Sequence, residues 1–429
     1  MSQILEVPMS NWQFSDVRRW CLDRDYRALL SADACHAAVP VAERFDWTGK
    51  AIEPGFRRMR VLGRQLFVLS RAALGGNASA QACAPLVANA VLGKCIGPNG
   101  QFVSRLDPAG RTVDATCDLY DIAFGLFGLA WWYRYSGDAR VLPAALRSVA
   151  HLNEVMRSPS GMGFVARTDA PVQHSQNPHM HLFEAALCLC AYLPHPDFAA
   201  LAAELFALAE QALFDPSSGT IAEEFDGNWR AAASRDGQIW IEPGHQFEWA
   251  WLLDQFAGLT GKMAPLRLAD RLFAFAESHG IDQTTGLVFD AVSPGGEVLA
   301  ADLRIWPNTE RLKAQVVMAE RAGRNRQSEA ALQDTLARIR HFYLRSRPLP
   351  QGGQLGEGWW IDYLHADGRT LKSDHVPAST LYHIVSAFSE IIRYCDNHEP
   401  FTCHTWHETE KSAPSMAGAG SRADRVANA

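Results

Sequence analysis

The chain has 429 residues, of which 48% are hydrophobic and 20% charged, and its formal net charge is -7 at pH 7. This composition is typical of a globular protein with ample material for a large core. The slight acidity gives no reason to expect binding to nucleic acid or to an anionic membrane. Nine scattered cysteines without a CxxC pair favour reduced thiols and a cytoplasmic location. No signal peptide is expected, and the longest apolar run, 122–133, is too short to span a bilayer.

Long apolar or amphipathic segments with Gly, Pro or Asp at their ends predict helices along most of the chain. In chain order, the clearest lie at 118–137, 179–193, 197–214, 243–256, 264–280 and 379–395. Between them are short stretches with strand and turn chemistry, such as 286–299 and 358–371. Strand runs are few and isolated, so a central sheet is not expected.

The helix starts recur at a regular spacing of 60 to 70 residues. Most are marked by proline, which suits the first turn of a helix. The six marks are Pro54, Asp118, Pro178, Pro243, Pro307 and Pro377. Each unit has room for a second, more polar helix, so the period predicts six helical hairpins packed on one another. Closed into a ring, they form an all-α (α/α)6 barrel with short β-hairpin excursions, and an open solenoid is the alternative. We expect one catalytic domain over residues 1–410 and a disordered tail over 411–429.

Polar residues gather near these starts. If the apolar helices form the inner layer, their N-termini meet at one end of the barrel, where helix dipoles favour a developing oxyanion. The residues brought there include His181, His245, Glu248, Glu310 and His383. Histidines that work near neutral pH favour proton transfer next to a carbonyl, as in sugar isomerisation or epimerisation.

Other site chemistries have weaker support. His181, His245 and His383 could converge on a metal ion, but no HExxH motif is present, so no metal is expected. Neither a GxxxxGK[ST] nor a suitably placed GxGxxG is found, so no nucleotide cofactor is expected. A glycosidase would need a carboxylate pair, and Asp118, Asp121, Glu248, Glu310 and Asp374 keep that alternative open. A binding or regulatory protein without catalysis is a further alternative.

The chain resembles the N-acylglucosamine 2-epimerase superfamily, which includes cellobiose 2-epimerases, D-mannose isomerases and other aldose–ketose isomerases. The resemblance covers about residues 10 to 395. It rests on "GRQLFVLS", "LYDIAF", "QNPHMHLFEA", "EPGHQFEWAWLL", "WPNTERLKA" and "GWWIDYLHADGR" with "HVPASTLYHI". The family implies an (α/α)6 barrel, in agreement with the period.

The resemblance also implies roles for individual residues. His245 and His383 match two acid/base histidines, Glu248 matches a carboxylate that assists the first of them, and Arg64 matches an arginine that polarises the carbonyl. Asn177 and His181 match a pair that engages sugar hydroxyls. Tyr120, Trp306 and Glu310 match positions that contact the sugar or line the pocket. Arg60 is a departure, because some relatives carry a tryptophan in the pocket wall there.

Together these observations predict an isomerase that interconverts D-mannose and D-fructose through a cis-enediolate, without metal or cofactor. The nearest alternative is a 2-epimerase acting on N-acylglucosamine, cellobiose or mannose. The expected partner is a monosaccharide substrate, not a nucleic acid or a membrane, and the chain is expected to be a monomer or a homodimer.

Overall fold

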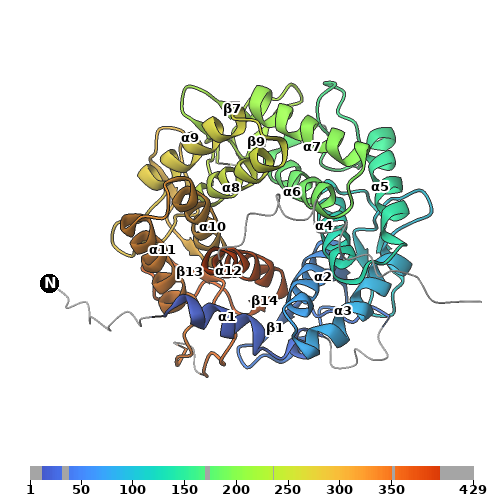
Figure 1. The fold of residues 1–429 in the computed structure, drawn as a ribbon, viewed down its shortest axis with the longest axis horizontal. Helices are drawn as coiled ribbons and strands as arrows, with labels where there is room; N and C mark the ends of the chain where they lie inside the picture. The colour runs from blue at the N-terminus through green and yellow to red at the C-terminus, as the bar shows by residue number, and fades with distance from the viewer. Residues whose placement is uncertain (1–11, 31–37, 170–173, 235, 350–352, 397–429) are drawn as a thin grey trace, which may run out of the picture.

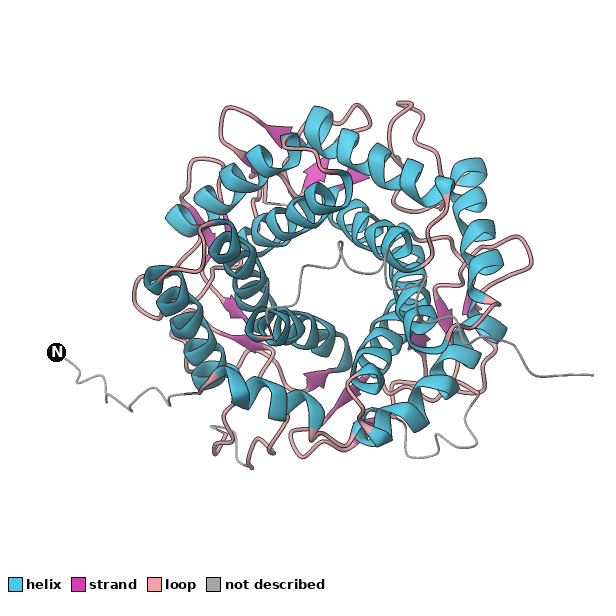
Figure 2. Ribbon diagram, viewed as in Figure 1, coloured by secondary structure: helices cyan, strands magenta, loops and turns pink. Residues whose placement is uncertain are grey.

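The computed structural model describes residues 12–30, 38–169, 174–234, 236–349 and 353–396. Within these ranges the chain forms two concentric rings of α-helices (Figures 1 and 2). The inner ring consists of α2 (Met59–Leu74), α4 (Leu119–Ser136), α6 (Gln176–Tyr192), α8 (Pro243–Thr260), α10 (Ile305–Arg321) and α12 (Leu381–Cys395). The outer ring consists of α1 (Phe14–Leu22), α3 (Ala78–Ala90), α5 (Val141–Val155), α7 (Pro196–Leu208), α9 (Ala264–His279) and α11 (Arg326–Ile339). The predicted (α/α)6 barrel is confirmed. The predicted tail, 411–429, lies outside the described residues.

Short single-turn segments complete the helical layers. The π-helical turns η2 (Val91–Cys95), η3 (Ala209–Leu213) and η4 (Arg340–Leu344) extend α3, α7 and α11, and the 3-10 turns are η1 (Tyr26–Leu29) and η5 (Ala378–Thr380). Among the described residues, no helix is both long enough and apolar enough to cross a bilayer.

Small antiparallel sheets tie neighbouring repeats together at the N-terminal end of the inner helices. Three sheets join β14 (Val376–Pro377) to β1 (Arg44–Phe45) and β2 (Ala51–Ile52), β3 (Arg57–Arg58) to β4 (Arg105–Leu106) and β5 (Thr112–Asp114), and β6 (His174–Ser175) to β9 (Glu224–Phe225). The others pair β7 (Phe214–Asp215) with β8 (Thr220–Ile221), β10 (Ala291–Val292) with β11 (Val298–Ala300), and β12 (Leu303–Arg304) with β13 (Tyr363–Leu364).

One arrangement recurs at all six inner helices. The backbone just before each helix pairs with a segment of the following repeat: β3 with β4, β6 with β9, β12 with β13, and β14 with β1. Isolated bridges do the same before α4, where Asp118 pairs with Arg167, and before α8, where Ile241 pairs with Val292. The pairing of β14 with β1 joins the last repeat to the first, and α12 packs on α2. The ring is therefore closed, which excludes the open solenoid.

The inner helices are buried on nearly every face, as their composition predicts. In α8 every residue from Pro243 to Leu253 is buried. Helices α2 and α4 approach especially closely, because a Cβ atom at Gly63 would lie 2.1 Å from the carbonyl oxygen of Phe124. This glycine contact brings the first turns of α2 and α4 together, which places Arg64 beside Tyr120.

Candidate active site

The imidazole of His383 is held by a buried carboxylate. Its Nδ1 lies 2.7 Å from Oε1 of Glu310, and Oε2 of Glu310 lies 2.6 Å from Nζ of Lys313. Because burial, reinforced by Arg64 and opposed by Glu310, lowers the pKa of His383 to about 3, this imidazole is neutral at neutral pH. Nδ1 then donates to the carboxylate, which leaves the lone pair on Nε2 free to accept a proton.

His245 has the opposite environment. Its Nδ1 lies 2.9 Å from Oε2 of Glu223 and 3.5 Å from Oε2 of Glu242. Burial lowers the pKa of His245, but the two carboxylates outweigh it and raise the pKa to about 9. His245 is therefore an imidazolium at neutral pH. Two groups whose surroundings separate their pKa values in this way are suited to act as a base and an acid.

The indole of Trp306 lies between these two histidines. Its centroid is 4.8 Å from that of His245 and 5.4 Å from that of His383. Trp306 is half-buried, at the first turn of α10. It therefore presents an apolar surface between the two histidines.

Arg64 supplies a positive charge beside the neutral histidine. One of its terminal nitrogens donates to the hydroxyl of Tyr120 at 2.7 Å, and its guanidinium carbon lies 4.1 Å from the ring centroid of Phe124. Within the described part of the chain it has no carboxylate partner, and its Nε has no hydrogen-bond partner. A buried guanidinium of this kind is suited to bind a developing oxyanion.

His181 faces the same space. Its ring centroid is 5.2 Å from that of Tyr120 and 6.5 Å from that of His383, and its Nδ1 lies 3.2 Å from Oε2 of Glu184. Burial, with Arg64 next, lowers its pKa well below the ordinary value. Half-buried Asn177 has a side-chain oxygen without a hydrogen-bond partner. Both residues therefore suit contact with sugar hydroxyls. His179, by contrast, binds the backbone of Ser175 and Phe164 and serves the fold.

Glu248, which the family resemblance implies as a carboxylate that assists His245, makes no hydrogen bond to it within the described residues, although its charge helps to raise the pKa of His245. It lies almost one turn further along α8, with Oε1 3.8 Å from Nδ1 of His181 and 3.4 Å from the hydroxyl of Tyr382. Burial and the nearby Glu310 raise the pKa of Glu248 well above its ordinary value. Glu223, from the loop between β8 and β9, reaches His245 instead.

The sequence analysis missed several residues of this network: Glu184, Glu223, Glu242, Lys313 and Tyr382. Glu184 and Lys313 had a usable signal, since each follows a selected residue by three positions on a helix and shares its face. Glu242 stands directly before Pro243, within a quoted motif. Glu223 had no such signal, because it comes from an irregular loop.

Three groups of side chains here have potential ligand atoms within 4.8 Å of one another: His181 with Glu184 and Glu248, Glu223 with Glu242 and His245, and Glu248 with Glu310 and His383. In the first two groups the histidine Nδ1 faces a carboxylate oxygen, as a hydrogen bond requires. In the third group the ammonium of Lys313 already provides a cation for Glu310. Within the described residues these side chains therefore hydrogen-bond or ion-pair with one another.

Several arginines near the N-terminal ends of the inner helices are paired with carboxylates. Arg60 contacts Asp121 at 2.7 Å and Asp118 at 2.9 Å, and Arg304 contacts Asp290 at 2.6 Å. Further pairs are Arg57 with Glu53 at 2.6 Å and Arg58 with Glu43 at 2.8 Å. The ion-paired guanidinium of Arg60 lies 4.8 Å from the ring centroid of Tyr120.

Comparison with known proteins gives consistent matches. The sequence profile of the N-acylglucosamine 2-epimerase family matches residues 41–387. A protein described as mannose-6-phosphate isomerase, from Rhizobium meliloti (strain 1021), is 31% identical over 350 residues, which span 78% of this chain and 85% of that protein. A solved D-mannose isomerase superposes with a TM-score of 0.75 at 18% identity, covering 90% of this chain and 99% of the other. The solved cellobiose 2-epimerase from Bacillus thermoamylovorans B4167 superposes with a TM-score of 0.76 at 16% identity, covering 89% of this chain and 99% of the other. At such identities the two solved structures establish the fold.

Proposed function

The chain belongs to the N-acylglucosamine 2-epimerase family and is an epimerase or isomerase, and from this we propose that it interconverts D-mannose and D-fructose. The observation that carries the proposal is the pairing of a neutral His383 with a protonated His245, beside an Arg64 that has no carboxylate partner in the described chain. Proton transfer next to a sugar carbonyl requires a base, an acid and a stabiliser of the oxyanion, and these three residues can supply them.

Each residue has a definite role in the proposed reaction. Once the sugar ring is open, Nε2 of His383 removes the proton from C2. Arg64 stabilises the negative charge that develops on the carbonyl oxygen O1, and His245 donates its proton to O1, which gives the enediol. His383 then returns the proton to C1 while the neutral His245 takes the proton from O2, which gives the ketose and restores both histidines. Asn177 and His181 bind hydroxyl groups of the sugar, and Trp306 holds it between the histidines.

A free sugar suits this site better than a phosphorylated one. The relative at 31% identity is named a mannose-6-phosphate isomerase, which supports a mannose skeleton and an aldose–ketose outcome. A phosphate group, however, would require cations at the mouth of the site. Near the N-terminal ends of the inner helices, Arg57, Arg58, Arg60 and Arg304 are each paired with a carboxylate, and Arg64 is needed at the carbonyl.

Proton NMR of D-mannose incubated with the enzyme in heavy water tests the proposal. We expect fructose carrying deuterium at C1. Glucose deuterated at C2 would instead establish the alternative, a 2-epimerase, which needs the same histidines but returns the proton to the opposite face of C2. Turnover of mannose 6-phosphate without turnover of mannose would contradict the proposal. N-acetylglucosamine and cellobiose in parallel reactions extend the test to the other epimerase substrates.

The pH profile tests the role of His245 as the acid. Since the reaction needs the imidazolium and its pKa is raised to about 9, kcat/KM is expected to fall as the pH rises above about 9. Replacing Glu223 by glutamine removes a charge that raises this pKa, so the alkaline limb should move to lower pH. Glu210→Gln, on an exposed surface, is the control and should leave the profile unchanged. An identical alkaline limb in Glu223→Gln would refute this role.

A further inference from the structure

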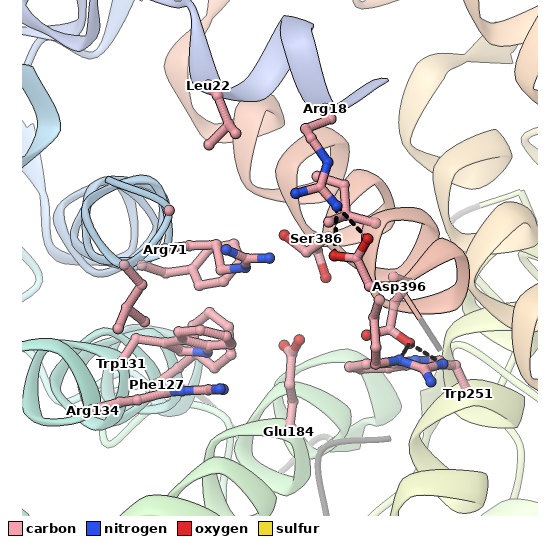
Figure 3. A pocket seen from close by; sticks show the side chains of 17 residues that line it. Arg18, Leu22, Arg71, Phe127, Trp131, Arg134, Glu184, Trp251, Ser386 and Asp396 are labelled. Carbon is pink, nitrogen blue, oxygen red and sulfur yellow. Dashed lines mark hydrogen bonds and ion pairs between the residues drawn. The ribbon is translucent and has the colours of Figure 1, made fainter. Parts of the chain in front are cut away.

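A cavity lies near the C-terminal ends of α2, α4 and α12 (Figure 3). Its volume is about 410 Å³, and its walls come from α2, α4 and α12, with α1 at its edge. The lining includes Arg18, Arg71, Phe127, Trp131, Arg134 and Glu184. None of the acid/base histidines lines it, so it is distinct from the site described above.

Two of the arginines at this cavity lack a carboxylate partner among the described residues. Arg18 pairs with Asp396, and Arg393 pairs with Glu320 and Glu390. Within the described ranges, the guanidinium of Arg71 makes no hydrogen bond or ion pair. Arg134 contacts the hydroxyl of Tyr192 and faces aromatic rings instead of a carboxylate.

The two unneutralised guanidinium groups act on one another. Burial is the main effect that lowers the pKa of Arg71, and the charge of Arg134 lowers it further. Arg71 is therefore partly desolvated and next to a like charge. An anion bound between the two would offset both costs, because guanidinium groups bind phosphate and carboxylate oxygens in a charge-assisted, bidentate manner.

Glu184 lies at the inner side of the cavity. Its Oε2 contacts Nδ1 of His181 and the hydroxyl of Tyr382, whereas its Oε1 is buried and has no hydrogen-bond partner among the described residues. Figure 3 shows this carboxyl group pointing towards the space that Arg71 also faces. Glu184 therefore connects the cavity with His181 of the candidate active site.

We propose that this cavity binds a small oxyanion, the phosphate or carboxylate group of a metabolite, between Arg71 and Arg134. The volume is in the range of small-ligand pockets. Because Glu184 lines the cavity and its Oε2 contacts His181, an occupant of the cavity also acts on the substrate end of the barrel. This makes the cavity a site for an effector, separate from the substrate.

Intrinsic fluorescence provides a binding assay, since Trp131 and Trp251 line the cavity. Inorganic phosphate is titrated into the full-length protein at constant ionic strength, with chloride as the reference anion. A saturable change is expected with phosphate and not with chloride. Arg71→Gln should weaken this binding by about 10-fold or more, since it removes a charge-assisted contact. Arg147→Gln, on the exposed face of α5, is the matched control and should bind as the wild type does.

Two further anions show which kind of metabolite supplies the oxyanion. A second variant and a check of folding exclude misfolding as the cause of lost binding. Citrate represents a carboxylate, and a hexose 6-phosphate represents a phosphorylated metabolite. Saturable binding of either that is lost in Arg71→Gln supports the proposal and identifies the source. Arg134→Gln should show the same loss, and circular dichroism verifies the fold of both variants. The proposal is overturned if none of the three anions gives a saturable change up to tens of millimolar, or if both variants bind as the wild type does.

Discussion

Replacing His383 by asparagine is expected to lower kcat for mannose isomerisation by about 10²- to 10⁴-fold, the usual contribution of a general base. The asparagine amide can still donate to Glu310, so the buried carboxylate keeps its partner. It has no counterpart of the Nε2 lone pair, so no group remains to take the proton from C2. Exchange of the C2 proton with heavy water should decline by the same factor as product formation.

His195→Asn is the matched control for this variant. His195 caps the N-terminus of α7 through its Nδ1, which accepts from the backbone N–H of Asp197. Asparagine is also a strong N-cap, so kcat and stability should stay near the wild-type values. A His383→Asn enzyme that retains wild-type kcat, or that loses activity only through a raised KM, would contradict the assignment of His383 as the base.

Much of the fold could be predicted because the starts of the inner helices recur at a regular spacing in the sequence. Pro243 does begin α8, and Asp118 caps α4. The start marked by Pro178 is off by two residues, since α6 begins at Gln176. Proline is tolerated anywhere in the first turn, where its missing N–H has no helical partner, so it marks a start only to within that turn. The period alone left ring closure open, because the pairing of β14 with β1 joins segments more than 300 residues apart, whereas the family resemblance implied the closed barrel.

The site was partly predictable for the same reason. Residues in the first turns of parallel inner helices had to meet, and Arg64, His181, His245 and His383 do lie around one space. The hydrogen-bond partners of the histidines were harder to predict, because a carboxylate from a loop can take the place of one on the same helix. Glu248 shares a helix with His245, yet the hydrogen bond belongs to Glu223. A periodic pattern gives the direction of a side chain on a helix, but not which loop reaches it.

Lys313 is the group whose loss should affect stability most. It is fully buried, its Nζ lies 2.6 Å from Oε2 of Glu310, and its charge also acts on Glu184 and Glu248. Replacement by methionine leaves a buried carboxylate without its cation. Removing one partner of a buried ion pair costs about 3–5 kcal/mol, so the free energy of unfolding near neutral pH should fall by about this amount. Lys262→Met, on an exposed turn, should change it by no more than about 0.5 kcal/mol.

The pH dependence of this loss distinguishes a charge effect from a packing effect. In the wild type, burial opposes ionisation of Glu310, but Lys313 and then His383 outweigh it and lower its pKa. This stabilises the fold above the pKa of the unfolded carboxyl and is lost as the pH falls. Without Lys313, the pKa of Glu310 should rise above the unfolded value, so the variant becomes less stable as the pH increases. The difference in the free energy of unfolding between wild type and Lys313→Met, measured with urea, should therefore become smaller from neutral pH towards about pH 5. If this difference in the free energy of unfolding does not depend on pH, the lost stability comes from the packing of Lys313 against Trp251 and not from its charge.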